Sequence, residues 1–373
     1  MYMNIIVFGG YGNFGRRICE SLAQLDDVRL VIAGRNLQKA KSLSDRLNRS
    51  ANCESTYAEL DGSDKDLSIQ LRDLHIELVI NASGPFQGQD YSIAKACIDA
   101  GINYLDLADS RDFVSGIRQL DEPAKQAGVS IITGVSTVPA LSSVVVESFL
   151  KEFAALEEYY AGITPGYQTE RGDATTAGIL SYVGKPIQIM NSGKRKTVTA
   201  LQGLHAYDYG NIFGRRLLGY VDVPDLELFP QRFSDLRDVR FYSGLEIRFM
   251  HLLLWCMTWL CRWNIVKNWA RLAKPIIRIS HLFDRMGTPD GGMFIELRGK
   301  DNNNNQKEIV WHLYAFDGDG PYVPTIPVIV LVKKLLNGEA FLKGAYPCLA
   351  MFSLDEFFDV ASNWKIEQRV TIR

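Results

Sequence analysis

Three glycines near the start of the chain have the spacing that binds the pyrophosphate of a dinucleotide. They form the motif Gly10-x-Gly12-x-x-Gly15, which follows an apolar run (Ile5 to Phe8) and precedes a helical pattern (Arg16 to Leu25). In such a unit the first glycine permits a tight turn, the second lets the backbone approach the pyrophosphate, and the third lets the helix pack closely against the strand. The helix start then offers N–H groups and its positive dipole end to the phosphates. We therefore predict nucleotide binding, with a plain tight turn as the alternative.

The end of the next strand indicates which nucleotide is bound. Val28 to Ala33 reads as the second strand, and Gly34-Arg35-Asn36 follows it. NAD-specific sites place an Asp or Glu near this point to bind the ribose 2′-hydroxyl, but this chain has Arg35 there and Lys39 one turn later. A guanidinium pairs with a 2′-phosphate and stacks on adenine, so the sequence predicts NADP(H) as the cofactor rather than NAD(H). A solvated Arg35 would leave this preference open.

Alternating strand and helix patterns position these residues and continue to about residue 135. This alternation predicts a right-handed parallel sheet, whose ligands lie beyond the carboxyl ends of its strands. The site is therefore expected at the strand ends, which are Arg35 with Asn36, Asp61, Ser83-Gly84-Pro85, Asp106 to Asp109 and Gly134 to Pro139.

Beyond Pro139 the pattern changes to longer alternating strands, which suit an antiparallel sheet. Apolar helical patterns at residues 326–337 and Ser353 to Ala361 are expected to pack back on the first domain. The predicted fold class is α/β, a Rossmann-type doubly wound parallel sheet with an inserted α+β domain that contains a mainly antiparallel sheet. The predicted domains are 1–138 for NADP binding, 139–322 for substrate binding and dimerisation, and 323–373 as a segment returning to the Rossmann domain.

Composition excludes several classes of partner and site. The formal net charge of −2 over 373 residues implies no nucleic-acid partner. Six scattered cysteines without a Cys-x-x-Cys pair indicate reduced thiols and a cytoplasmic location, and five histidines without a metal-binding spacing predict no metal site. The N-terminal apolar stretch is too short for a signal peptide.

Two residues are the candidates for catalysis of hydride transfer. Asp109 lies just past the fifth predicted strand and is the best-placed titratable group, although capping of a helix that starts near Asp112 is the alternative. Tyr91 opens the helix after Gly84-Pro85 and is a second candidate proton donor, with simple packing as its alternative.

One segment is unusually apolar. Phe249 to Cys261 carries no formal charge apart from a protonated His251, and Trp255, Trp259 and Trp263 form one stripe on a helix. Residues 245–286 contain seven Lys or Arg and two acids, a balance of +5. Thirteen residues are too few to span about 30 Å of hydrocarbon. Three readings stay open: core or homodimer packing, peripheral membrane contact through 249–269, and a lipophilic wall of the substrate site.

The first 150 residues resemble the saccharopine dehydrogenase family, in particular the saccharopine reductase-like branch and its uncharacterised bacterial members. The matching stretches are Gly9-Gly10-Tyr11-Gly12-Asn13-Phe14-Gly15-Arg16, Ala33-Gly34-Arg35, Ala82-Ser83-Gly84-Pro85-Phe86, residues 96–107 and Gly134-Val135-Ser136-Thr137-Val138-Pro139. Looser matches follow at residues 223–228, 291–294 and 318–321.

The resemblance implies an NADP(H)-dependent oxidoreductase with its active site between a Rossmann domain and an inserted domain. By position, Gly10, Gly12, Gly15 and the amides of Asn13 and Phe14 hold the pyrophosphate. The resemblance further assigns the 2′-phosphate to Arg35, the adenine edge to Asp61, and the nicotinamide ribose to Ser83-Gly84-Pro85.

The substrate stays open within this resemblance. Saccharopine-forming enzymes carry an Asp-Pro-Gly element where this chain has Thr137-Val138-Pro139-Ala140, which argues against saccharopine itself. Hydride transfer to or from a C=N, C=O or C=C bond of a small molecule is the main hypothesis. A lipid-linked substrate of the family's trans-acting enoyl reductases and a non-catalytic NADP-binding protein at a membrane surface are the alternatives.

Overall fold

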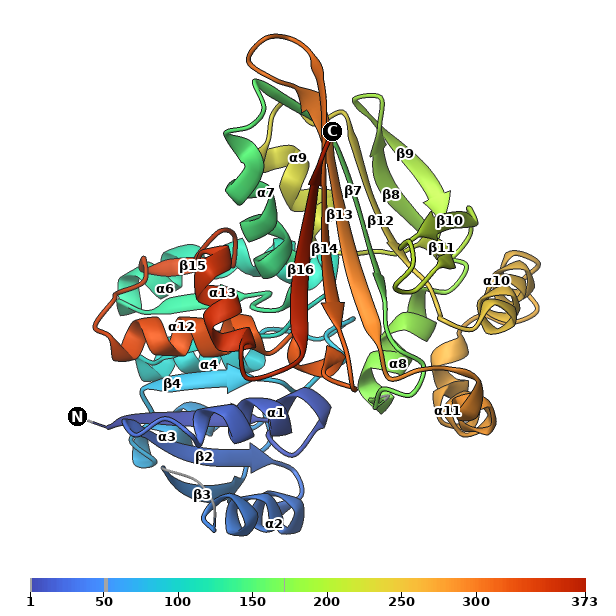
Figure 1. Cartoon of the computed structure of the whole chain (residues 1–373). Coiled ribbons are helices and arrows are strands. Elements are labelled where there is room, and N and C mark those ends of the chain that lie inside the picture. Colours follow the sequence, from blue (N-terminus) through green and yellow to red (C-terminus); the bar gives the residue numbers. More distant parts are fainter. Residues whose placement is uncertain (1, 50–52, 171) are drawn as a thin grey trace. The chain divides into compact units, whose positions relative to one another are not determined.

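The computed structural model describes residues 2–49, 53–170 and 172–373, which fold into two compact units (Figure 1). Unit 1 comprises Met1–Leu141 and Pro324–Val360, and unit 2 comprises Ser142–Val323 and Ala361–Arg373. Unit 2 is thus inserted into unit 1, and the chain crosses back into unit 2 at its end.

Unit 1 contains a parallel sheet of seven strands in the order β15-β6-β5-β4-β1-β2-β3. Successive strands extend to one side of β1 and then, after β3, to the other, so the order reverses between β1 and β4. Such a reversal is the switch point at which doubly wound sheets bind ligands. The strands are β1 (Met3–Phe8), β2 (Val28–Gly34), β3 (Glu54–Glu59), β4 (Leu78–Asn81), β5 (Asn103–Asp106), β6 (Ser130–Thr133) and β15 (Gly344–Pro347).

Helices pack on the sheet of unit 1 because its central strands are apolar and buried on both faces. On one face, Ile6 of β1 joins the apolar cluster formed with α3, α4 and α6. On the other face, Ile32 of β2 and Cys19 of α1 both lie close to Gly10. The helices are α1 (Asn13–Leu22), α2 (Leu37–Leu47), α3 (Leu67–Asp73), α4 (Ser92–Ala100), α5 (Arg111–Gly116), η1 (Ile117–Leu120), α6 (Asp121–Ala127), η2 (Thr137–Leu141), α12 (Ile326–Leu336) and α13 (Leu354–Ala361). The predicted Rossmann-type sheet is therefore confirmed.

Unit 2 contains a mixed sheet in which most neighbours are antiparallel, as predicted, and β7 and β12 pair in parallel. The turn at residues 301–305 joins β13 to β14. The strands are β7 (Ala155–Thr164), β8 (Pro186–Asn191), β9 (Lys194–Thr199), β10 (His205–Asp208), β11 (Arg215–Tyr220), β12 (Asp238–Ser243), β13 (Gly291–Lys300), β14 (Gln306–Ala315) and β16 (Ile366–Ile372).

Residues 248–286 form several helices rather than one. Asn264 has a left-handed backbone (φ 58°) directly after α10, which is a common way for a helix to end. The chain resumes in short helices that follow one another up to Met286. The helices of unit 2 are α7 (Ser142–Leu150), α8 (Asp173–Tyr182), α9 (Asp225–Arg232), α10 (Arg248–Arg262), η3 (Trp269–Leu272), α11 (Ala273–Ser280), η4 (His281–Met286) and η5 (Gly320–Tyr322).

The predicted return segment, residues 323–373, is also divided. Its first part supplies α12 and β15, and β15 extends the parallel sheet of unit 1 next to β6. Its last part, β16, pairs instead with β14 along the edge of the unit 2 sheet. Both strands are short or polar in sequence, and a distant partner strand rather than a local pattern determines where each of them pairs.

Candidate nucleotide-binding site

The loop after β1 brings the two central strand ends of unit 1 together. Gly9 has a left-handed backbone (φ +68°), and a Cβ atom there would lie 3.0–3.1 Å from the backbone of Ala82 and Ser83, which follow β4. The Gly12 N–H donates to the Gly9 carbonyl at 2.8 Å and closes the turn. Gly12 is also the N-cap of α1 and supplies no capping side chain, so an anion can bind at this helix start.

Close packing explains why glycine is needed at two further positions of this loop. A Cβ at Gly15 would overlap the Gly9 carbonyl and lie 2.9 Å from Gly10 Cα. A Cβ at Gly10 would lie 2.9 Å from Ile32 Cγ2 of β2. The loop is therefore a backbone cradle that side chains would fill, as a pyrophosphate site requires.

The end of β2 presents one unpaired cation. Arg35 is exposed, and among the described residues no hydrogen bond or ion pair engages its guanidinium. Asn36 is occupied differently, because its side chain accepts the Lys39 N–H at 3.0 Å and caps α2. Arg35 is therefore available to bind an anionic group. Asn36 stabilises the start of α2, in addition to the cofactor contact predicted for it.

Tyr11 links the glycine loop to the end of β2, a role that our sequence reasoning missed. Its ring atoms lie 2.6–2.9 Å from the position of a Cβ at Gly34, and its hydroxyl accepts the Asn36 N–H at 3.1 Å. The ring thus lies directly over Gly34. An aromatic residue between the first two glycines of the motif was the available signal.

Asp61 lies beyond β3, the neighbour of β2 in the sheet. Its Oδ1 accepts the Ser63 N–H at 3.0 Å and the Ser63 hydroxyl at 2.8 Å. These bonds, with a smaller contribution from the charge of Arg35, hold the pKa of Asp61 below its ordinary value. Asp61 is therefore an exposed carboxylate at neutral pH, on the same side of the site as Arg35.

The segment after β4 is held by hydrogen bonds from two side chains. Buried Asn81 accepts the Ser83 N–H at 3.0 Å and also the Ser83 hydroxyl, while its Nδ2 donates to the Tyr104 hydroxyl at 3.1 Å. Gln89 donates to the Ser83 and Pro85 carbonyls at 2.9 and 2.8 Å. The predicted ribose-binding segment, Ser83-Gly84-Pro85, is thereby fixed beside the glycine loop.

Asp109 lies beyond β5 and is exposed. Gln87 Nε2 donates to its Oδ1 at 3.2 Å. Helix α5 begins at Arg111, with Ser110 as its N-cap and no capping bond from a side chain, so Asp109 does not cap this helix. Desolvation by the surrounding protein raises the pKa of Asp109 above its ordinary value, although the bond from Gln87 opposes the shift. A carboxyl with a raised pKa on the ligand-binding edge of the sheet remains a catalytic candidate.

The side chain of Tyr91 packs against Phe113 of α5. Its hydroxyl donates to the Phe113 carbonyl at 2.7 Å, and the two rings lie 4.6 Å apart between centroids. Burial raises the pKa of its hydroxyl above the ordinary value. A proton-donating role for Tyr91 would require this hydrogen bond to break, so the packing alternative fits the structure better.

Asp106, buried at the end of β5, joins the segments that follow β5 and β6. Its Oδ1 accepts the N–H groups of Ala108 and Gly134 at 2.9 and 2.8 Å and the Thr133 hydroxyl at 2.8 Å. Burial raises the pKa of Asp106 to about 6, although these hydrogen bonds oppose the shift. A charged residue closing an apolar strand was the sequence signal for this role.

We expect Asp106→Asn to remove part of the pH dependence of stability. The folded chain keeps the proton on Asp106 up to about pH 6, whereas the unfolded chain loses it near the ordinary value of 3.8. The free energy of unfolding should therefore fall by about 3 kcal/mol as the pH rises through this window, and the asparagine variant should lack that fall.

Urea unfolding of both proteins between pH 4 and pH 7, followed by circular dichroism, measures this difference. All six tryptophans lie in unit 2, so tryptophan fluorescence would not report on unit 1. Parallel stability curves for the two proteins would show that Asp106 does not titrate in this window.

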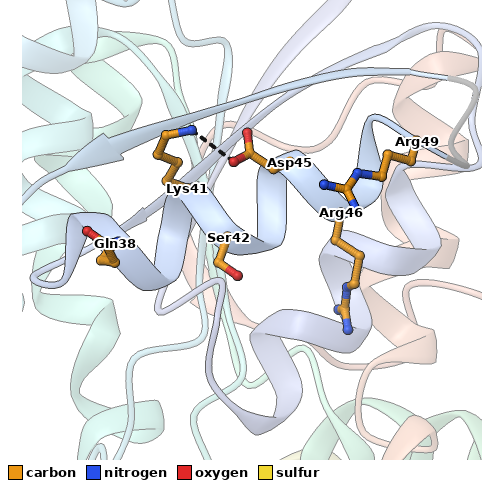
Figure 2. Close-up of a pocket in the computed structure, with 6 residues that line it drawn as sticks. All are labelled: Gln38, Lys41, Ser42, Asp45, Arg46 and Arg49. Carbon is orange, nitrogen blue, oxygen red and sulfur yellow. Dashed lines mark hydrogen bonds and ion pairs between the residues drawn. The ribbon is translucent and has the colours of Figure 1, made fainter.

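A surface pocket on α2 is separate from this cradle (Figure 2). The residues that line it are Gln38, Lys41, Ser42, Asp45, Arg46 and Arg49. Lys41 pairs with Asp45 at 2.8 Å within the pocket, and Arg46 pairs with Glu20 of α1 at 2.6 Å. Lys41 and Arg46 of this pocket are thus each paired with an acid, unlike Arg35.

Part of this chain is similar in sequence to known proteins. A protein of Mycobacterium tuberculosis named "Putative trans-acting enoyl reductase" is 28% identical over 147 residues, which cover 38% of this chain and 34% of that protein. The "Lipid droplet localized protein" of Caenorhabditis elegans is 23% identical over 145 residues, which cover 37% of this chain and 34% of that protein. The match therefore spans about a third of the length of each curated relative.

The fold of the whole chain has a counterpart among solved structures. Saccharopine dehydrogenase (L-Glu forming) from Saccharomyces cerevisiae, solved without ligand, aligns with a TM-score of 0.69 over 99% of this chain and 100% of that one, at 12% identity. That likeness concerns the fold. Residues 5–132, which contain the glycine cradle, Arg35, Asp61 and Asp109, match the saccharopine dehydrogenase NADP binding domain family. The sequence match and the parallel sheet agree, and this part of the chain belongs to the family of saccharopine dehydrogenase NADP-binding domains.

Proposed function

We propose that this chain is an NADP(H)-dependent oxidoreductase that transfers hydride to or from a C=N, C=O or C=C bond of a small molecule. The observation that carries the proposal is the glycine cradle at the switch point, beside an exposed and unpaired Arg35. The family of residues 5–132 agrees with a nicotinamide cofactor.

The residues around the cradle suit each part of the cofactor. The first turn of α1 offers its N–H groups to the pyrophosphate, and Arg35 offers a guanidinium to a 2′-phosphate. No acid stands at the end of β2 to bind a 2′-hydroxyl, which supports NADP(H) over NAD(H). When bound, the cofactor supplies or accepts the hydride.

Asp109 is the residue that we propose to exchange a proton with the substrate. Its exposed carboxyl lies past β5, and the hydrogen bond from Gln87 orients it. A carboxyl in that position can protonate the atom next to the carbon that receives the hydride.

We expect Asp109→Asn to lower turnover about 100-fold or more while NADPH binding stays unchanged, because general acid–base catalysis typically contributes 10² to 10⁴. The measurement is NADPH oxidation with a panel of imines, ketones and enoyl thioesters. Asp112→Asn is the matched control, since Asp112 is exposed three residues away in the first turn of α5. Normal turnover of Asp109→Asn would remove Asp109 from the mechanism.

A lipid-linked enoyl thioester is the second substrate class that we propose. It is supported by the similarity to the mycobacterial protein and by the apolar segment around α10. Turnover of enoyl thioesters but not of imines in the same panel would favour it. Tight NADPH binding without turnover of any substrate would favour a non-catalytic NADP-binding protein.

A further inference from the structure

The polarity of α10 is reversed relative to an ordinary surface helix. Between Phe249 and Cys261 the uncharged polar residues are His251 and Thr258, and both are fully buried. Thr258 accepts a hydrogen bond from Gln202 Nε2 at 3.0 Å, so this side of the helix packs on unit 2. The opposite side exposes large apolar residues, with Leu253 54% and Trp263 64% exposed.

This arrangement needs an explanation because a surface helix normally turns its apolar side inward. Leu252 and Leu253 belong to this exposed side, whereas Trp255 and Trp259 are half-buried at its margin and lead to the exposed Trp263, with successive rings 5.8 and 6.0 Å apart. Contiguous exposed apolar surface of this kind marks a binding surface rather than an ordinary solvated face.

The segment after α10 extends the same surface. Helix α11 buries Ala273, Ile277 and Ser280 but exposes Ile279, and the following turn exposes Leu282 at 79%. Phe249 of α10 contacts Phe283 of η4, which directly follows α11, with ring centroids 5.3 Å apart. Figure 1 shows α10 and α11 at the edge of unit 2, beyond the strands. We call residues 249–286 the α10–α11 surface.

Cations surround the apolar residues of this surface. Five of them are exposed, and among the residues that the structure describes none of the five has an acidic partner; they are Lys267, Arg271, Lys274, Arg278 and Arg285. Elsewhere in the chain many exposed cations are paired, as in Arg195–Glu227 and Lys41–Asp45. Residues 245–286 carry a balance of +5 in a chain whose formal net charge is −2.

We propose that the α10–α11 surface binds the surface of an anionic phospholipid membrane. Tryptophan and aliphatic side chains of α10 would enter the boundary between headgroups and acyl chains, and the five cations would lie against lipid phosphates. The contact is interfacial, since no helix in the described part of the chain is long and apolar enough to cross a bilayer.

Charge favours a membrane over a second copy of this chain. A two-fold contact would place the surface against itself and bring its unpaired cations together. An anionic lipid surface instead neutralises them, and it also accepts the apolar side chains between them. The proposal goes beyond the oxidoreductase function and does not depend on it.

The test is co-sedimentation of the whole chain with vesicles, at low and high salt. One set is phosphatidylcholine alone, and the other contains about one-third phosphatidylserine to supply negative charge. We expect binding to the anionic vesicles that weakens in high salt. Leu253→Ser/Trp263→Ser and Lys274→Glu/Arg278→Glu should each weaken binding more than tenfold.

The matched controls change the same residue types elsewhere. Leu342 is 80% exposed in unit 1, so Leu342→Ser removes exposed apolar surface, and Arg49→Glu reverses a charge on an exposed cation. Both should bind vesicles as the wild type does, and NADPH titration of every variant reports on folding of unit 1.

Two results would overturn the proposal. The first is no binding to either kind of vesicle, or binding that all variants share with the wild type. The second is a wild-type dimer in sedimentation equilibrium that Leu253→Ser/Trp263→Ser converts to monomer without a change in vesicle binding. That second result would assign the surface to a second copy of the chain.

Discussion

Replacing Arg35 by alanine should lower the affinity for NADPH about 100-fold and leave the affinity for NADH nearly unchanged. Hydrogen bonds to charged groups contribute roughly 1.5–3 kcal/mol, and NADH lacks the 2′-phosphate that would accept them. The side chain is exposed and has no partner among the described residues, so its removal breaks no structural contact. Fluorescence titration of both nucleotides at fixed salt measures the two affinities.

Arg49→Ala is the control for a general loss of positive charge. Arg49 is exposed and follows the far end of α2, in the pocket of Figure 2, whereas Arg35 precedes the start of that helix. Its variant should bind NADPH like the wild type. An equal fall for NADPH and NADH in Arg35→Ala would show that Arg35 does not recognise the 2′-phosphate.

Replacing Gly15 by alanine should weaken NADPH and NADH together, by roughly tenfold to 100-fold. The new methyl group would overlap the Gly9 carbonyl and approach Gly10 Cα at 2.9 Å, and backbone atoms on both sides cannot move as a flexible side chain would. Overpacking of this kind typically costs about 1–3 kcal/mol. The loop must shift away from α1, which displaces the N–H groups that would bind the pyrophosphate.

Gly320→Ala is the matched control for a glycine-to-alanine change. A Cβ at Gly320, in η5, would meet only Thr169 Cγ2, at 4.0 Å, so this variant should bind both nucleotides normally. Thermal unfolding by circular dichroism separates loss of the fold from loss of binding. Wild-type affinity in a folded Gly15→Ala protein would contradict the close packing that the structure shows.

Local patterns account for the parts of the fold that the sequence predicted well. The order of apolar strand, glycine turn and helix around Gly10, and the alternation of strands and helices up to β6, are properties of neighbouring residues. The positions of Arg35 and Asp109 follow from the same reasoning, because the residue after a parallel strand always lies at its ligand-binding edge.

Long-range pairing explains most of what the sequence did not predict. Strand β15 pairs with β6 and β16 with β14, across separations of about 210 and 60 residues, and neither strand has a strong local pattern. The hydrogen bonds of Asp106 and Tyr91 likewise depend on segments that approach one another only in the folded chain.

The sequence by itself therefore determined the nucleotide-binding unit, the residues at its strand ends and the tryptophan stripe of α10, since each is a matter of spacing along the chain. Only the tertiary structure decided that Tyr91 packs against Phe113, that Asn81 and Asp106 hold the loops of the site, and that α10 exposes Leu252, Leu253 and Trp263. Helical periodicity defines which residues share a face, but the element packed against a helix selects which face is buried. In α10 the packing against unit 2 buries His251 and Thr258 and leaves the apolar side of the helix exposed.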